Sequence, residues 1–316
     1  MSANDKLAVA TRAAPATPER QRSPLGGHSP LANAARAFLA DRGALVGLTL
    51  FLILLVLALG APAIVPFDPT AVHMQDRFQA PSARYLLGTD ELGRDLLSRV
   101  IYGARASFLV GIVAVVIGLF GGVPLGLVAG FYRGRIDDAI MRVLDAMLAF
   151  PGIILALAIV SMLGPSLLNV MLAVGIVAIP AYGRITRGAV LAVRGQEFVL
   201  AARAIGAGDG RLMLRAILPN CLSPLLVQAS IGFANAILAE TTLSFLGVGL
   251  QPPTPSWGTM LDTGRKYLRQ TAWYSVSAGG AVFLAVLSLN LLGDGLRDAL
   301  DPRLQRRGGR STDVGS

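Results

Sequence analysis

Few residues of this chain have side chains that could act as a nucleophile, a metal ligand or a phosphate-binding group. The only lysines, histidines and cysteine are Lys6, Lys266, His28, His73 and Cys221. A phosphate-binding P-loop needs a glycine-rich loop that ends in Lys followed by Ser or Thr, and neither lysine stands in such a loop. A zinc protease site of the type His-Glu-x-x-His is also missing from the sequence. We therefore expect no catalytic residue, no metal site and no cofactor bound by this chain.

Four polar side chains stand inside otherwise apolar stretches, and these are the candidates for lining a path through a membrane: Gln228, Asn235, Glu240 and Asn290. A carboxylate within a membrane is costly and is by default a functional candidate, although the two threonines that follow Glu240 could simply solvate it. The three amides could instead make interhelical hydrogen bonds, worth about 0.6 kcal/mol each. The sequence leaves path lining and packing open for all four.

The composition is that of a protein dissolved in lipid. Hydrophobic residues make up 53% of the 316 residues and charged residues only 15%, whereas soluble domains average about 25% charged residues. The formal net charge is +9. Because the basic residues are spread among separate segments and not gathered on one soluble face, nucleic acid is excluded as a partner.

Apolar runs long enough to cross about 30 Å of hydrocarbon predict six transmembrane helices and an all-α membrane protein. The run between Asp145 and Arg184 is about twice the length of one span, and Gly164 and Pro165 divide it into two. The predicted spans are Gly43 to Phe67, Ala106 to Tyr132, Ala146 to Leu163, Leu167 to Gly183, Ala216 to Ala239 and Gln270 to Gly293.

The positive charges predict the orientation. With both termini in the cytoplasm, 20 of the 28 Lys and Arg residues lie on the cytoplasmic side, as the positive-inside rule requires. The chain then divides into a disordered cytoplasmic tail (1–36), a first transmembrane helix that serves as an uncleaved anchor (37–66), a periplasmic loop (67–105), a five-helix core (106–295) with a cytoplasmic loop (184–219), and a cytoplasmic C-terminal tail (296–316).

The cytoplasmic segment from Glu197 to Asn220, EFVLAARAIGAGDGRLMLRAILPN, predicts two short helices joined by a turn. Gly206 suits the residue after a helix, where a positive φ is needed, and Asp209 is a candidate cap for the second helix. Pro219 is expected to stop that helix before the fifth span. Such a knob could press into a groove on another protein or lie as an amphipathic helix on the lipid surface, and periodicity alone does not separate the two.

This segment resembles the EAA loop of ABC importer permeases, with the pattern Glu-Ala-Ala, three residues, Gly, and a distal Ile-x-Leu-Pro. Ala201, Ala202, Gly206, Leu218 and Pro219 fall on the pattern. Two positions depart from it, because Leu200 occupies the place of the Glu and Ile217 sits one place from the expected Ile. The resemblance implies that these residues, with Glu197 and Arg203, form the coupling helix that docks on an ATPase subunit.

Three further segments resemble the second permease subunit of the dipeptide, oligopeptide and nickel transporters: LGTDELGRDLLSRVIYGARASF (87–108), AETTLSFLGVGLQPPTPSWGTML (239–261) and GDGLRDALDPRL (293–304). The resemblance implies a type I ABC importer permease in the bacterial inner membrane. It also implies a heterodimer with a homologous permease, two ATPase subunits or domains that hold ATP and magnesium, and a periplasmic or extracellular peptide-binding protein.

Two other classes of membrane protein are alternatives to a peptide-importing permease. An ion-coupled secondary transporter would need carboxylates at mid-membrane and paired broken helices, and Asp145 and Glu240 lie at the ends of predicted spans. A scaffold without transport has no feature in its favour. Within the resemblance, dipeptide, oligopeptide, glutathione and nickel substrates cannot be separated by sequence.

The 87–108 segment, with Asp90, Glu91 and Arg94, predicts a salt-bridged turn at the outer mouth of the channel.

Overall fold

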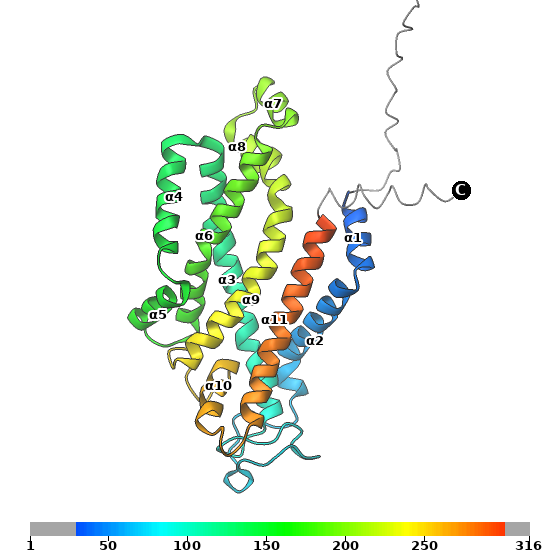
Figure 1. Cartoon of the computed structure of the whole chain (residues 1–316), viewed down its shortest axis with the longest axis vertical. Coiled ribbons are helices and arrows are strands. Elements are labelled where there is room, and N and C mark those ends of the chain that lie inside the picture. Colours follow the sequence, from blue (N-terminus) through cyan, green and yellow to red (C-terminus); the bar gives the residue numbers. More distant parts are fainter. Residues whose placement is uncertain (1–29, 301–316) are drawn as a thin grey trace, which may run out of the picture.

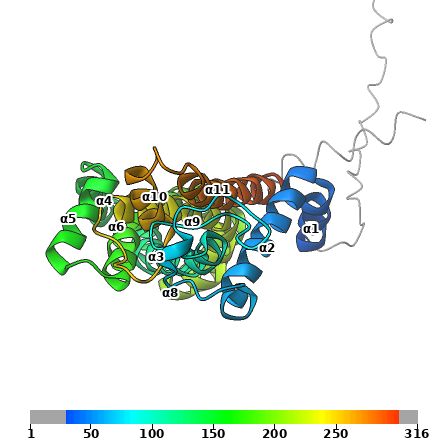
Figure 2. The ribbon, with the colours of Figure 1, turned by 90° about the horizontal axis from the view of Figure 1, so that it is seen from below.

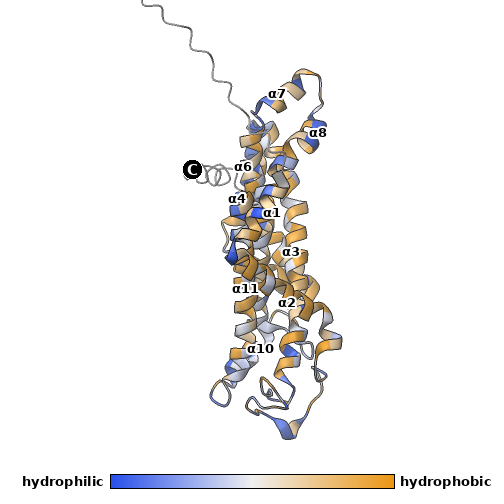
Figure 3. Ribbon diagram, turned by 90° about the vertical axis from the view of Figure 1, so that its right-hand side faces the viewer, coloured by the Kyte–Doolittle hydropathy of each residue, from blue (hydrophilic) through white to orange (hydrophobic). Residues whose placement is uncertain are grey.

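The computed structural model describes residues 30–300, with side chains from residue 32, and within that range it is helical with no named strand. Five stretches are long and apolar enough to cross a membrane: α2 (Arg42–Ile64), α3 (Leu96–Tyr132), α6 (Leu167–Val193), the continuous helical stretch Asp209–Phe245 that contains α9 (Leu222–Phe245), and α11 (Trp273–Leu300). They run side by side along the long axis of the molecule (Figure 1). Apolar residues fill the middle of this bundle, and polar residues gather at its two ends (Figure 3).

The predicted third span, Ala146 to Leu163, is a pair of helices bent by 84°. The first is α4 (Gly134–Leu148) and the second is α5 (Gly152–Leu163). Pro151 stands at the break, where it lacks a donor N–H and disfavours helical geometry in the residue before it. The 12 residues of α5 extend only about 18 Å, so α5 alone cannot cross the bilayer. The bundle therefore has six spans only if the bent pair is counted as one.

Other boundaries also differ from those predicted. α1 (Pro30–Ala40) occupies part of the predicted disordered tail, and residues 1–29 lie outside the described part of the chain. α3 begins at Leu96, within the predicted outer loop, because Asp95 caps it by accepting hydrogen bonds from Ser98. α6 continues into the predicted cytoplasmic loop, and α11 continues to Leu300, so only residues 301–316 of the predicted C-terminal tail fall outside the description.

The two ends of the bundle carry different structures. One end carries α7 (Glu197–Ala204) and α8 (Asp209–Arg211), and α1 and the C-terminal part of α11 lie toward this end (Figure 1). The other end carries the 65–95 segment with its 3₁₀ turn Met74–Asp76, and α10 (Trp257–Lys266). Seen from that end, α5 lies at one edge of the molecule and α1 with α2 at the opposite edge (Figure 2).

The tightest helix pair is α3 against α6, and it depends on glycines spaced four residues apart. Gly118, Gly122, Gly126 and Gly130 face α6. A Cβ at Gly122 would come within 2.5 Å of the Ile179 carbonyl oxygen, and one at Gly126 would overlap the Gly183 carbonyl oxygen. Small residues at this spacing allow the backbones of two transmembrane helices to approach closely, so that van der Waals packing holds them together in lipid.

Replacing one of these glycines should loosen the bundle. We expect Gly126→Ala to lower the stability of the protein by about 1–3 kcal/mol, the usual cost of overpacking a filled interface, and to lower its thermal unfolding midpoint in detergent. Gly188→Ala on α6 is the matched control, because a Cβ there meets open space and alanine favours the helix. Equal midpoints for the two variants would contradict the close contact described here.

Candidate functional site

The knob predicted for the coupling role begins with α7, which starts at Glu197 and ends at Ala204. Its C-terminus turns at Gly206, whose φ is +87°. The turn is closed by hydrogen bonds from the Gly206 N–H to the Arg203 carbonyl (3.0 Å) and from the Ala207 N–H to the Ala202 carbonyl (3.1 Å). The positive φ predicted for Gly206 is thereby confirmed, and the reason is that a residue with a Cβ is disfavoured in this conformation.

The second half of the knob differs from the prediction. Gly208 is the N-cap of α8, and no side chain caps that helix, so Asp209 does not cap it. Pro219 does not end the helix either, because the stretch Asp209–Phe245 stays helical throughout. The chain accommodates Pro219 through a π-helical segment, Leu212–Ile217, followed by a 3₁₀ turn, Leu218–Cys221. The widened turn places the Leu218 N–H on the Met213 carbonyl, which provides the room that a proline ring needs inside a helix.

The knob is fixed to the ends of two spans. Val199, Leu212 and Ile217 are buried in one cluster with Phe131 of α3 and Val190 of α6. In addition, Arg194 donates to the carbonyl oxygens of Gly130 and Phe131 at the end of α3 (3.2 and 2.9 Å), and the guanidinium of Arg203 lies 5.6 Å from the centre of the Phe131 ring. A force on the knob is therefore transmitted directly to α3 and α6.

Most residues predicted for coupling lie on the outside of the knob. Glu197, Ala201, Arg203, Gly206 and Pro219 are exposed, whereas Ala202 and Leu218 are half-buried.

Sequence reasoning missed a hollow of about 280 Å³ between α7 and the π-helical segment, with Arg211 and Arg215 among its lining residues. It also missed Ile205, which is 87% exposed. The four-residue spacing of the two arginines, which places them on one helix face, was the available signal. An exposed apolar tip beside a hollow with arginines is suited to contact with another protein.

The four polar residues predicted for the membrane path are not brought together. Gln228 and Asn235 line one cavity of about 340 Å³, between α5, α6 and α9. Asn290 lies on an exposed face of α11 and does not line that cavity. Glu240 is fully buried within the chain, where it accepts hydrogen bonds from the hydroxyls of Ser107 (3.0 Å) and Ser244 (2.9 Å). α9 continues beyond Glu240 to Phe245, so Glu240 lies inside the helix and not at its end. Its bond with Ser107 joins α9 to α3, and its side chain faces no open surface.

The end of the bundle opposite the knob contains buried ion pairs. Asp90 is fully buried and pairs with Arg94 (2.6 Å) and Arg99 (3.3 Å), while Arg94 also pairs with Glu91 (2.8 Å). Arg99 further donates to the carbonyl oxygen of Pro69 (2.9 Å). The predicted salt-bridged turn is confirmed, and its pairs are buried, so removing one partner would cost more than at an exposed pair.

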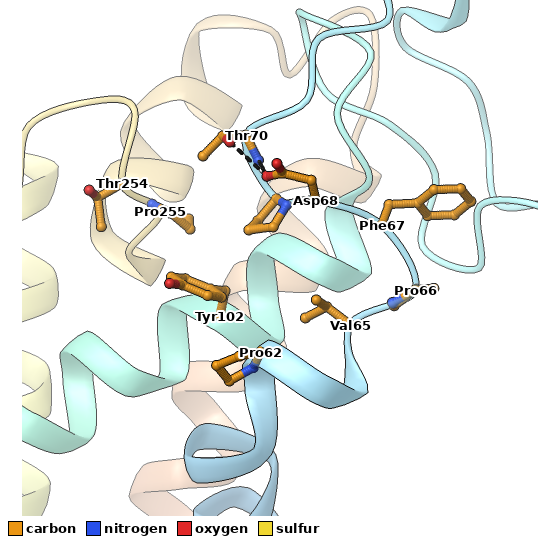
Figure 4. A pocket seen from close by; sticks show the side chains of 10 residues that line it. Pro62, Val65, Pro66, Phe67, Asp68, Thr70, Tyr102, Thr254 and Pro255 are labelled. Carbon is orange, nitrogen blue, oxygen red and sulfur yellow. Dashed lines mark hydrogen bonds between the residues drawn. The ribbon is translucent and has the colours of Figure 1, made fainter.

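Beside this turn lies an open crevice of about 570 Å³, lined by the end of α2, the loop that follows it, Tyr102 of α3 and Pro255 (Figure 4). Asp68 stands at its wall and accepts hydrogen bonds from the side-chain hydroxyl (2.6 Å) and the backbone N–H (2.7 Å) of Thr70. The hydroxyl bond, followed by the backbone bond, lowers the pKa of the Asp68 carboxyl below its usual value. The crevice therefore presents a negative charge at neutral pH.

The chain forms a bundle of helices long and apolar enough to cross a membrane, with an exposed knob at one end, and comparison with known proteins identifies its family. Residues 122–306 match the model of the binding-protein-dependent transport system inner membrane component, and residues 29–81 match the N-terminal transmembrane domain of oligopeptide transport permease C. The chain belongs to this family of ABC transporter permeases and is a multi-pass protein of the bacterial inner membrane.

Particular relatives are similar over most of their length. The di/tripeptide transport system permease protein DppC of Pseudomonas aeruginosa is 50% identical over 284 residues, covering 88% of this chain and 93% of the relative. The dipeptide transport system permease protein DppC of Escherichia coli is 49% identical over 285 residues, covering 88% and 95%. A solved chain of the MetNI methionine ABC transporter, in an inward-facing conformation, shares the fold with a TM-score of 0.56 at 18% identity, covering 65% of this chain and 98% of that one.

Removing the buried carboxylate should destabilise the outer end. Asp90→Asn leaves Arg99 buried without its anionic partner, and breaking such a pair costs about 3–5 kcal/mol, so we expect a clearly lower thermal unfolding midpoint in detergent. Asp262→Asn is the control, because Asp262 pairs only with Arg265 and Lys266, which are 62% and 59% exposed, and should cost at most about 1 kcal/mol. If both variants unfold at the same temperature, the buried pairs do not stabilise the outer end.

Proposed function

We propose that this permease forms one half of an ATP-driven importer of dipeptides or short oligopeptides. The coupling knob carries the proposal, because it is exposed at its tip and packed at its base against α3 and α6. The peptide substrate is supported by relatives that are named dipeptide permeases and match 88% of the chain. Nickel and glutathione import by the same kind of assembly are the alternatives that uptake measurements would separate.

The proposed assembly contains the partners that such a machine requires. A homologous permease completes the path as a heterodimer, and a periplasmic or extracellular binding protein delivers the peptide to the outer end. Two ATPase subunits or domains bind ATP and magnesium and carry out hydrolysis, so this chain itself is a non-catalytic conduit. An ion-coupled secondary transporter would need no exposed knob of this kind, and the family membership of the chain argues against it.

In the proposed mechanism, closure of the ATPase pair pushes on the knob residues Glu197, Ala201, Arg203 and Gly206. Because Val199 and Leu212 are buried against the ends of α3 and α6, the push moves these two spans together. The path then changes its access from the outer to the inner side of the membrane. Both termini lie in the cytoplasm in this arrangement, on the side of the knob.

Gly206→Asp tests the coupling. The substitution places a Cβ at a φ of +87°, which costs about 1–2 kcal/mol, and adds a negative charge at the proposed ATPase contact. In proteoliposomes that contain the full complex, we expect ATP-dependent uptake of a labelled dipeptide to fall by at least about 10-fold, the factor that 1.4 kcal/mol represents.

Gly195→Asp is the matched control, because Gly195 precedes α7, is exposed and has open space for a side chain, and it should retain uptake. Copurification of the ATPase subunits shows whether docking or transmission is lost. Normal uptake by Gly206→Asp, or dipeptide uptake without any ATPase subunit, would remove the coupling role from the knob.

A further inference from the structure

The cavity between α5, α6 and α9 has an unusual lining for a site within a membrane. Only three of its lining side chains are polar, namely Tyr182, Gln228 and Asn235, and none is charged. Its volume of about 340 Å³ falls at the lower end of the range for small-molecule sites, about 300–1,000 Å³. A cavity of this size and composition suits a short neutral segment with a few polar groups, such as a stretch of peptide backbone.

The two carboxamides in this cavity have no hydrogen-bond partner among the described residues, whereas two hydroxyl side chains of the same helix do. Thr242 donates to the Leu238 carbonyl oxygen and Ser230 donates to the Leu289 carbonyl oxygen (2.7 Å each). Gln228 is half-buried and Asn235 is exposed, so both carboxamides are accessible from outside this chain. Within a membrane such groups need hydrogen-bond partners, and these two are free to bind a group that enters the cavity.

The spacing of the two amides fits an extended peptide. Gln228 and Asn235 are seven residues apart on α9, which places them about 10.5 Å apart along the helix and on one face. An extended chain advances about 3.3–3.6 Å per residue, so this separation corresponds to about three peptide residues. A carboxamide offers both donors and an acceptor, the complement of the C=O and N–H groups of a peptide backbone.

We infer that Gln228 and Asn235 bind the backbone amide groups of the passing peptide, and that the uncharged lining lets peptides pass irrespective of side-chain charge. This inference rests on the proposed function and specifies its substrate-contacting residues. The side chains of the passing peptide then contribute little to its rate of passage.

The test creates a charge preference where none existed. Asn235→Asp keeps the size of the side chain and adds one negative charge to the cavity. We compare ATP-dependent uptake of the tripeptides Lys-Lys-Lys, Ala-Ala-Ala and Glu-Glu-Glu by the full complex at pH 8, well above the ordinary Asp pKa of about 3.9, with the binding protein saturated by each. The wild type should move the three at similar rates. The variant should raise the ratio of Lys-Lys-Lys to Glu-Glu-Glu uptake by about 10-fold or more, given the attraction between unit charges in a partly shielded site.

Asn290→Asp is the matched control, since Asn290 is an exposed asparagine on α11 that does not line the cavity, and its uptake ratio should stay at the wild-type value. An unchanged ratio in Asn235→Asp would overturn the inference. So would an equal fall for all three tripeptides together with loss of the second permease on copurification, which would assign the cavity to the permease interface. If the wild type moves neither dipeptides nor tripeptides with ATP present, the proposed function itself fails, and that result is separate from the ratios.

Discussion

The close approach of α3 and α6 is the constraint on which the rest of the bundle depends. Lipid tails are as apolar as leucine side chains, so helices in a membrane gain little from burying hydrophobic surface and must be held by close packing. The glycines Gly118, Gly122, Gly126 and Gly130 provide that packing along nearly the whole inner half of α3. Beyond the last of them, Arg194 closes the end of the same pair by binding the carbonyl oxygens of Gly130 and Phe131. The knob is built on this end, and its mechanical connection to the spans follows from the tight pair beneath it.

The second constraint is that each polar group in the bilayer needs a partner. Glu240 receives two serine hydroxyls and is thereby used to join α9 with α3. Asp137 of α4 receives both the Nε and an Nη of Arg187 (2.6 and 2.7 Å), which attaches the amphipathic α4 to α6. The carboxylates of Glu240 and Asp137 are already bonded to other residues of this chain. They are therefore poor candidates for contact with a solute. Gln228 and Asn235 are different, because they line a cavity and have no hydrogen-bond partner within residues 30–300.

The sequence predicted the features that depend on local chemistry. The end of α7 before Gly206 and the positive φ of Gly206 follow from the preference for glycine after a helix, and the long apolar runs located five of the spans. Prediction from the sequence failed where one residue type is compatible with two local structures. A helix breaks at Pro151, whereas at Pro219 the helix continues through a π-helical segment. The difference depends on whether the neighbouring turn can widen. Asp209 satisfied the preference for a cap, yet the chain placed Gly208 in that position. The polar candidates were the right residue types, but only tertiary packing separated buried Glu240 and outlying Asn290 from the two amides of the cavity.

These constraints together explain how a chain without reactive side chains can serve transport. A charged group in the cavity would hold peptides of opposite charge and repel the others, since an unscreened charge acts strongly at low dielectric. Neutral amides bind weakly enough for a peptide to leave, and they bind the backbone that all peptides share. In the proposed assembly, selectivity for peptides over other solutes arises mainly before the membrane, at the protein that delivers them. In the proposed mechanism, the energy enters at the opposite end, through the knob, because α3 and α6 connect that knob to the bundle whose α6 forms one wall of the cavity.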